Sequence, residues 1–105
     1  MFTPMPTTTP VLDPRAHAQV ERAAAILGGH GATEVYVYGS VVTDRWDPEW
    51  SDIDFAVRGL PPDRYFRAAG EVARGIGREV DILDLDVPSR LAGFLQDEGD
   101  LLRVG

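Results

Sequence analysis

The sequence VYVYGSVVTDRWDPEWSDIDFAV, residues 35–57, places a Gly-Ser pair and an Asp-Ile-Asp triplet on two consecutive segments of β character. β-branched and aromatic residues precede the Gly-Ser pair, so residues 33–39 are predicted to form a strand. Residues 51–59, SDIDFAVRG, alternate between polar and apolar side chains and predict a second strand. A short helix over residues 40–45 and a loop are expected to connect the two, so the motifs lie on consecutive strands.

Two helices are predicted on either side of this stretch. The first begins with Asp13 as N-cap and Pro14 in the first turn. It ends at the glycine pair Gly28-Gly29, and the second helix begins at Pro61-Pro62. Apolar positions at the helical period are Ala16, Val20, Ala23, Ala24 and Leu27 in the first helix and Tyr65, Ala69, Val72, Ala73 and Ile76 in the second.

The last third of the chain predicts a strand, a helix and a short extended segment. Residues 78–86, REVDILDLD, favour a third strand, and a last helix runs from Asp86, a suitable N-cap, to Gly99. The side chains expected to face the core from this helix are Leu91, Phe94 and Leu95. Residues 101–104, LLRV, favour a fourth short strand or an extended tail. This order predicts an α/β (α+β) domain in which helices flank a small mixed β-sheet, and it leaves the strand order open.

Length and composition limit the classes of protein to consider. With 105 residues, we expect a loose tail over residues 1–12 and one domain over residues 13–105. The net charge is −7 and all ten basic residues are arginine, which argues against direct nucleic-acid binding through a broad basic face. The absence of cysteine excludes disulfides and thiolate metal sites. Neither a secretory signal nor a membrane-length apolar run is present, so we expect a cytoplasmic protein with no membrane partner.

Three aspartates are the candidates for metal binding. Side chains alternate along a strand, so Asp52 and Asp54 are expected on one face and Ile53 on the other. Two carboxylates that close repel each other unless they are protonated or bridged by a cation, and such hard oxygen ligands suit Mg²⁺ or Mn²⁺. Asp81 lies between two apolar positions of the third strand and joins the pair if the second and third strands are neighbours. Three convergent carboxylates predict a site for two Mg²⁺ ions, with Mn²⁺ as a substitute.

The Gly-Ser pair supplies a candidate phosphate site beside these acids. Gly39 permits close approach of a ligand to the backbone. The Ser40 hydroxyl and the first amides of the short helix can hold phosphate oxygens. We therefore expect metals and a phosphorylated ligand to share one edge of the sheet.

Each motif alone has an ordinary structural explanation, because a D-x-D on a strand is usually solvated and a Gly-Ser pair is usually a turn. Asp84 and Asp86 are interpreted as structural, and His17 and His30 as surface residues. Trp46 and Trp50 either stack on a base or a partner, or simply pack the loop. The order of strand, Gly-Ser, loop, D-x-D strand, helix and third Asp is more specific than any single motif.

That order resembles the nucleotidyltransferase superfamily of DNA polymerase beta, and within it the minimal nucleotidyltransferases, or MNT family. The pieces that carry the resemblance are VYVYGS, SDIDFAV and EVDILDLD, within residues 33–104. The family signature is a GS motif, a DxD strand and a carboxylate on a later strand, here Asp52, Asp54 and Asp81. Many relatives have arginine directly after GS, whereas valines follow here, and Arg45 is the nearest candidate to neutralise a triphosphate.

The resemblance implies an antitoxin that transfers AMP from ATP to a tyrosine of a partner HEPN RNase toxin. Gly39 and Ser40 would hold the β- and γ-phosphates, and Asp81 would act beside the acceptor hydroxyl. Two alternatives stay open: transfer to a small molecule such as an aminoglycoside, and an antitoxin that only masks its partner. The loop from Trp46 to Trp50 and the C-terminal LLRVG are the candidate docking surfaces.

Overall fold

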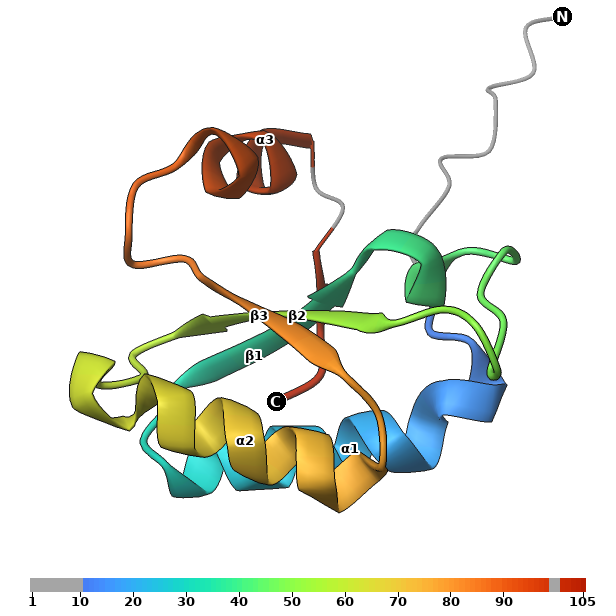
Figure 1. The fold of residues 1–105 in the computed structure, drawn as a ribbon. Helices are drawn as coiled ribbons and strands as arrows, with labels where there is room; N and C mark the ends of the chain where they lie inside the picture. The colour runs from blue at the N-terminus through green and yellow to red at the C-terminus, as the bar shows by residue number, and fades with distance from the viewer. Residues whose placement is uncertain (1–10, 99–100) are drawn as a thin grey trace, which may run out of the picture.

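The computed structural model describes residues 11–98 and 101–105. Residues 1–10 of the predicted tail and Gly99, the predicted end of the last helix, lie outside the described residues. The elements are η1 (Pro14–Ala16), α1 (His17–Gly29), β1 (Glu34–Tyr38), η2 (Gly39–Val42), β2 (Ile53–Arg58), η3 (Pro62–Arg64), α2 (Tyr65–Ile76), β3 (Val80–Asp84), α3 (Arg90–Glu98) and β4 (Leu102–Arg103), where η denotes a 3-10 helix. Figure 1 shows their arrangement.

The four strands form one mixed sheet in the order β3-β2-β1-β4. β1 pairs with β2 and with β4 in antiparallel fashion, whereas β2 and β3 run parallel. The predicted α+β class and mixed sheet are therefore confirmed, and the C-terminal segment forms the fourth strand. The order left open by the sequence puts β2 between β1 and β3, so the two strands that carry aspartates are neighbours.

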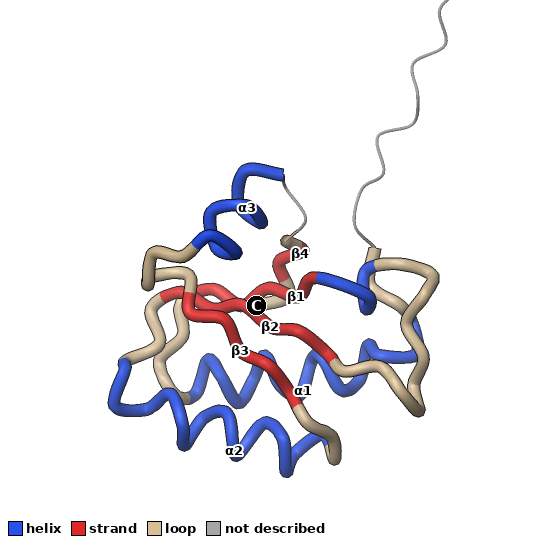
Figure 2. The backbone as a smooth tube through the Cα atoms, turned by 45° about the horizontal axis from the view of Figure 1, so that its top comes forward, coloured by secondary structure: helices blue, strands red, loops and turns tan. Residues whose placement is uncertain are grey.

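The helices lie on both sides of the sheet (Figures 1 and 2). Helices α1 and α2 cover one face, where Ile53, Phe55 and Val57 of β2 pack into the main hydrophobic core. Helix α3 lies over the opposite face, where Ala56 belongs to a smaller cluster. Because residues alternate along β2, Asp54 lies on the α3 side of the sheet.

The ends of α1 and α2 follow from local chemistry. The Asp13 carboxylate accepts a hydrogen bond from the Arg15 backbone at 2.9 Å and caps the first turn, as predicted. Leu12 packs against the core beside it. After the last residue of α2, Gly77 forms the C-cap with φ of 71°. This left-handed conformation is favourable for glycine because it has no Cβ to clash with the backbone.

Helix α3 differs from its prediction in both its cap and its buried face. Ser89 accepts the Ala92 backbone N–H at 3.0 Å, so serine and not Asp86 caps the helix. Ala92 and Leu95 are buried, whereas Leu91 and Phe94 are 46% and 57% exposed. The small Ala92 side chain lets this short helix approach the sheet, and the two larger side chains turn outward. The expectation that Leu91 and Phe94 face the core was wrong.

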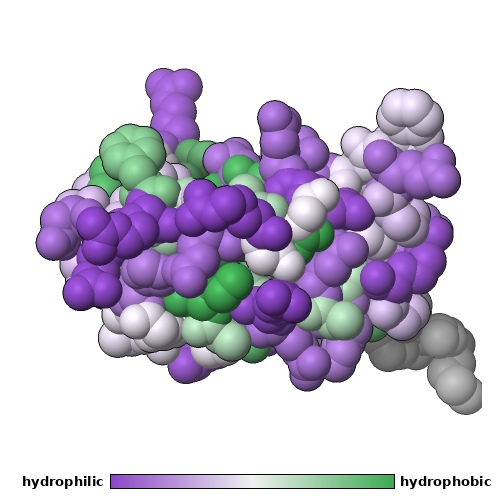
Figure 3. Space-filling view, turned by 60° about the horizontal axis from the view of Figure 1, so that its bottom comes forward, coloured by the Kyte–Doolittle hydropathy of each residue, from purple (hydrophilic) through white to green (hydrophobic). Residues whose placement is uncertain are grey.

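The outer surface of the α1–α2 layer is mostly hydrophilic, with scattered apolar patches (Figure 3). Within the part of the chain that the structure describes, no helix has both the length and the apolar character needed to cross a membrane.

Candidate functional site

The central acid of the site is Asp54, which lies between two other strands. Its register partner in β1 is Tyr38, and its register partner in β3 is Asp81. Residues paired in register point to the same face, so all three side chains project on the α3 side. The pairing of β2 with β3 thus brings Asp81 beside Asp54, as the sequence predicts for neighbouring strands.

Asp52 precedes β2 and is exposed. Its backbone carbonyl accepts a hydrogen bond from Trp46 Nε1 at 3.1 Å. Asp52 is two residues from Asp54, close enough for its charge to raise the pKa of the Asp54 carboxyl. The third acid therefore comes from a loop held by a tryptophan rather than from the strand itself.

The electrostatics of the site disfavour negative charge. Burial, followed by the charges of Asp81 and Asp52, raises the pKa of the Asp54 carboxyl. Burial and the charges of Asp54 and Asp81 also raise the pKa of Tyr38 to about 12. Tyr38 is therefore a neutral phenol at physiological pH, and the acids have a repulsion that a cation would relieve.

The Gly-Ser motif lies directly against this acid group. Gly39 has φ of 76°, and a Cβ placed on it would lie 2.7 Å from Asp54 Oδ2. Ser40 follows in η2, where its carbonyl accepts hydrogen bonds from Thr43 N and Oγ1 at 3.0 and 2.7 Å. Arg45 is exposed, and its backbone N–H donates to Thr43 Oγ1 at 3.1 Å. The structure thus brings Gly39 to Asp54, while the Arg45 guanidinium has no polar partner in the described part of the chain.

The donor chemistry of Asp52, Asp54 and Asp81 suits a divalent cation. Asp54 and Asp81 are also paired in register on neighbouring strands. Carboxylate oxygens are the ligands that Mg²⁺ and Mn²⁺ prefer. The glycine at position 39 also leaves space beside Asp54 that a side chain would fill. Within residues 11–98 and 101–105, however, no group of three or more acidic or histidine side chains is already arranged around one point. The backbones of Asp54 and Asp81 are therefore already paired, and the three aspartate side chains would have to rotate before they could bind one ion together.

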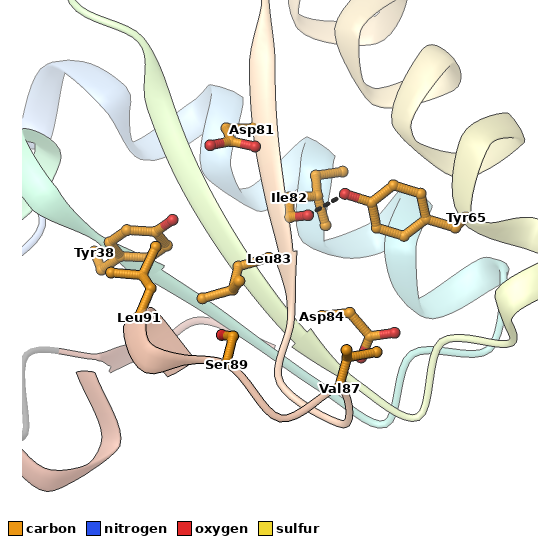
Figure 4. Close-up of a pocket in the computed structure, with 9 residues that line it drawn as sticks. All are labelled: Tyr38, Tyr65, Asp81, Ile82, Leu83, Asp84, Val87, Ser89 and Leu91. Atoms are coloured by element: carbon orange, nitrogen blue, oxygen red, sulfur yellow. Dashed lines mark hydrogen bonds between the residues drawn. The ribbon is translucent and has the colours of Figure 1, made fainter. Parts of the chain in front are cut away.

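A pocket of about 270 Å³ lies beside the acids along β3. Figure 4 shows Asp81, Leu83 and Tyr38 on one side of the strand, and Tyr65 and Asp84 on the other. The Tyr65 hydroxyl donates a hydrogen bond to the Ile82 carbonyl. Val87, Ser89 and Leu91, which precede or begin α3, complete the lining. The volume is small, and the walls are largely apolar apart from the carboxylates.

Asp84 and Asp86 have structural contacts. Asp84 Oδ1 accepts the Asp86 backbone N–H at 2.9 Å, which stabilises the turn after β3. Asp86 Oδ2 accepts the Gly59 backbone N–H at 2.6 Å, and its carboxylate lies 3.7 Å from the Arg58 guanidinium. These contacts fix the turn to the end of β2.

Four other residues test the sequence interpretation of the surface. Trp50 is 82% exposed, but Trp46 is 1% exposed, so of the two alternatives left open for the tryptophans, packing of the loop holds for Trp46, and only Trp50 is available for docking. His17 is exposed as predicted, whereas the His30 side chain is only 12% exposed and contacts Glu71 of α2. No local pattern marks Trp46 as buried, because the arginines that enclose it lie 31 residues before it and 32 residues after it.

The chain is similar to known nucleotidyltransferases in sequence and in fold. The family model of the nucleotidyltransferase domain matches residues 20–98. Comparison with curated proteins gives no match. Eleven chains among solved structures match.

A structure assigned as a minimal nucleotidyltransferase has a TM-score of 0.66 and 24% identity, and the match covers 86% of this chain and 93% of that one. A toxin-antitoxin structure with AMP-PNP has a TM-score of 0.65 and 21% identity, and the match covers 80% of this chain and 70% of that one. The complex of a tri-AMPylated Shewanella oneidensis HEPN toxin with an MNT antitoxin has a TM-score of 0.60 and 21% identity, and the match covers 82% of this chain and 68% of that one.

These structures establish the fold, and the family model covers most of the chain, including the Gly-Ser motif and all three candidate acids. The chain belongs to the nucleotidyltransferase domain family.

Proposed function

We propose that this protein is a Mg²⁺-dependent antitoxin that transfers AMP from ATP to a tyrosine of a partner HEPN RNase toxin. The observation that carries the proposal is the position of Asp54, in register with Asp81 and against the backbone of Gly39. That juxtaposition supports a shared site for a metal and a phosphate chain. The similarity to an MNT antitoxin bound to a tri-AMPylated HEPN toxin supports the choice of partner.

Each residue has a defined role in this proposal. Asp52 and Asp54 would hold both ions, and Asp81 would complete the site on the acceptor side. When bound, the divalent ions would neutralise charge on the phosphates and on the attacking and leaving oxygens. Gly39 and Ser40 would bind the β- and γ-phosphates, with Arg45 supplying positive charge. The tyrosine oxygen forms a bond to the α-phosphorus, the bond to the β-phosphate oxygen breaks, and pyrophosphate leaves.

The pocket along β3 supports an acceptor of the size of one side chain. Its volume of about 270 Å³ is below the range of about 300–1,000 Å³ typical of small-molecule pockets. Asp81 lines it, so a phenol entering there would have its hydroxyl beside a carboxylate able to accept the proton. Tyr38 lies in the same wall, and burial with the charges of Asp54 and Asp81 raises its pKa to about 12, so its hydroxyl loses a proton less readily than an ordinary tyrosine.

Transfer can be tested with ATP labelled at either end of the triphosphate. The protein is incubated with Mg²⁺, a co-encoded HEPN protein and ATP labelled at the α- or the γ-phosphate. The proposal predicts that the partner acquires the α-label only, and that a variant with its acceptor tyrosine changed to phenylalanine acquires none. Label from the γ-position would indicate phosphoryl transfer and would contradict the proposal.

The exposed apolar residues near the pocket favour masking as a second candidate function. Val87, Leu91 and Phe94 are 46–57% exposed and lie on or just before α3. If these residues bind the partner without transfer, the partner loses RNase activity in the absence of ATP and acquires no label. Efficient labelling of a free aminoglycoside without any partner would instead favour the small-molecule alternative.

A further inference from the structure

The loop over residues 43–52 is held by a buried tryptophan between two arginines. The Trp46 side chain is 1% exposed. The guanidinium carbon of Arg15 lies 5.8 Å from the centre of its ring, and that of Arg78 lies 5.0 Å from it. Both distances are within the range of cation–π contacts. The loop that precedes Asp52 therefore has its own packed centre.

Hydrogen bonds extend from this centre to the loop backbone. Trp46 Nε1 donates to the Asp52 carbonyl at 3.1 Å, and Arg78 Nη1 donates to the Ser51 carbonyl at 2.7 Å. Arg78 Nη2 also donates to the Pro48 carbonyl at 2.5 Å. Arg15 Nη2 donates to the Trp46 carbonyl at 2.6 Å. Charged donors make stronger hydrogen bonds than neutral ones, so these side chains restrict the loop up to the residue before β2.

The position of Arg78 connects the two strands that carry acids. Arg78 follows Gly77, the C-cap of α2, and lies two residues before the start of β3 and three residues before Asp81. β2 and β3 pair from their first residues, because Ile53 is the register partner of Val80. One arginine thus links the beginning of β3 to the backbone next to Asp52.

We propose that Trp46 and Arg78 are positioning residues that fix the backbone at Ser51–Asp52 and so hold the Asp52 carboxylate ready to join Asp54 around a divalent cation. This inference rests on the proposed function, since it assumes that the acids bind a cation. Asp54 is fixed by a strand on either side, whereas Asp52 lies outside the sheet. Side chains that hold a metal ligand in place typically change metal affinity by about 10–100-fold when mutated.

Positioning and simple electrostatics predict opposite results for Arg78. A guanidinium near the acids repels a cation, so removal of its charge alone would tighten cation binding. Loss of its hydrogen bonds frees the Ser51–Asp52 backbone and would weaken binding. The sign of the change therefore distinguishes the two roles.

The test measures Mn²⁺ binding to the full chain by electron paramagnetic resonance, which reports free Mn²⁺ and needs no enzymatic turnover. Trp46→Phe keeps an aromatic ring near the arginines and removes the N–H donor to Asp52, together with part of the buried ring volume. Arg78→Gln removes the charged donors, and Arg74→Gln makes the same change at an exposed position within α2. We expect the first two variants to weaken Mn²⁺ binding about tenfold and Arg74→Gln to change it little. Circular dichroism establishes that each variant is folded, and Arg78→Lys replaces Arg78→Gln if the latter unfolds.

Asp52→Asn separates failure of this inference from failure of the proposed function. If Asp52→Asn weakens Mn²⁺ binding but Trp46→Phe and the Arg78 variant bind as tightly as the wild type, or more tightly, the positioning role is refuted and the metal site stands. If the wild type and Asp52→Asn bind Mn²⁺ equally, Asp52 is not a ligand, and both proposals fail.

Discussion

The backbone of Gly39 lies against the carboxylate of Asp54, so closely that a Cβ at residue 39 would be 2.7 Å from Oδ2. Gly39 also has φ of 76°, a conformation that costs other residues about 1–2 kcal/mol. Gly39→Ala is therefore expected to lower the melting temperature by several degrees and to displace the Asp54 side chain. AMP transfer should fall by at least about 100-fold, because that carboxylate is a proposed ligand.

Gly77→Ala is the matched control for this variant. Gly77 has φ of 71°, but a Cβ there would meet no atom within 4 Å. The backbone cost is similar and the added Cβ contacts none of the three acids, so the melting temperature should fall while transfer continues at a rate well above that of Gly39→Ala. If Gly39→Ala and Gly77→Ala lost AMP transfer to the same extent, the effect of Gly39→Ala would be explained by the lower stability of the fold and not by displacement of Asp54.

Asp54→Asn should stabilise the protein in metal-free buffer at pH 7. Burial and two neighbouring acids raise the pKa of Asp54 above the ordinary aspartate value of 3.8, so the folded state holds this proton more tightly than the unfolded state. The stability that goes with the protonated form is complete below 3.8 and is lost as the pH rises through the raised pKa. Thermal melting at a series of pH values measures the difference between wild type and variant.

The gain in Asp54→Asn should grow with pH over that window and vanish below it. Mg²⁺ or Mn²⁺ should also reduce the gain, since a cation bound to the native state stabilises the wild type by linkage. A variant less stable than the wild type at pH 7, with no dependence on pH, would contradict the electrostatic account of Asp54.

The acids should separate into two groups when each is changed to asparagine. Asp52→Asn, Asp54→Asn and Asp81→Asn should each lower AMP transfer by at least about 100-fold without unfolding the protein, because each removes a charged ligand at similar volume. Asp84→Asn and Asp86→Asn should keep transfer, although Asp86→Asn loses its ion pair with Arg58. Single-turnover labelling of the partner measures all five. An inactive Asp84→Asn beside an active Asp81→Asn would reverse the assignment.

Leu91 tests the acceptor pocket. It lines the pocket and is 46% exposed, so Leu91→Asp leaves the core intact but adds a charge where an apolar ring would enter. We expect the rate of transfer to the partner to fall about tenfold, equivalent to about 1.4 kcal/mol. Gln96→Asp, a similar change elsewhere on α3, is the control. Metal-dependent stabilisation should be the same in both, and a normal rate for Leu91→Asp would place the acceptor elsewhere.

Most of the fold could be predicted from the sequence because its signals are local. The cap at Asp13, the periodicity of α1 and the β-branched run of β1 lie within single elements. The strand order could not be predicted, since it depends on contacts between distant segments. The outward side chains of Leu91 and Phe94 were missed for a related reason. On this short helix, the face of Ala92 and Leu95 and the face of Leu91 and Phe94 are both plausible inner faces, and the sheet beneath decides between them.

The candidate acids were also identifiable from their spacing, but the residues that hold them were not. Alternation relates Asp52 to Asp54, and the pairing of β2 with β3 brings in Asp81. The burial of Trp46 between Arg15 and Arg78 depends on three separate parts of the chain. An arginine in an acidic sequence is usually interpreted as an exposed charged residue. No local signal therefore indicates that Arg15 and Arg78 pack against the Trp46 ring.

The most direct measurement of the central claim is a crystal structure of the protein with Mn²⁺ and AMP-PNP, with the metal located by its anomalous signal. Mn²⁺ should contact the carboxylates of Asp52, Asp54 and Asp81, and the triphosphate should lie against the Gly39–Ser40 backbone. The α-phosphate should face the pocket beside Asp81. Mn²⁺ bound away from these three aspartates, or a triphosphate on another face of the sheet, would contradict the account.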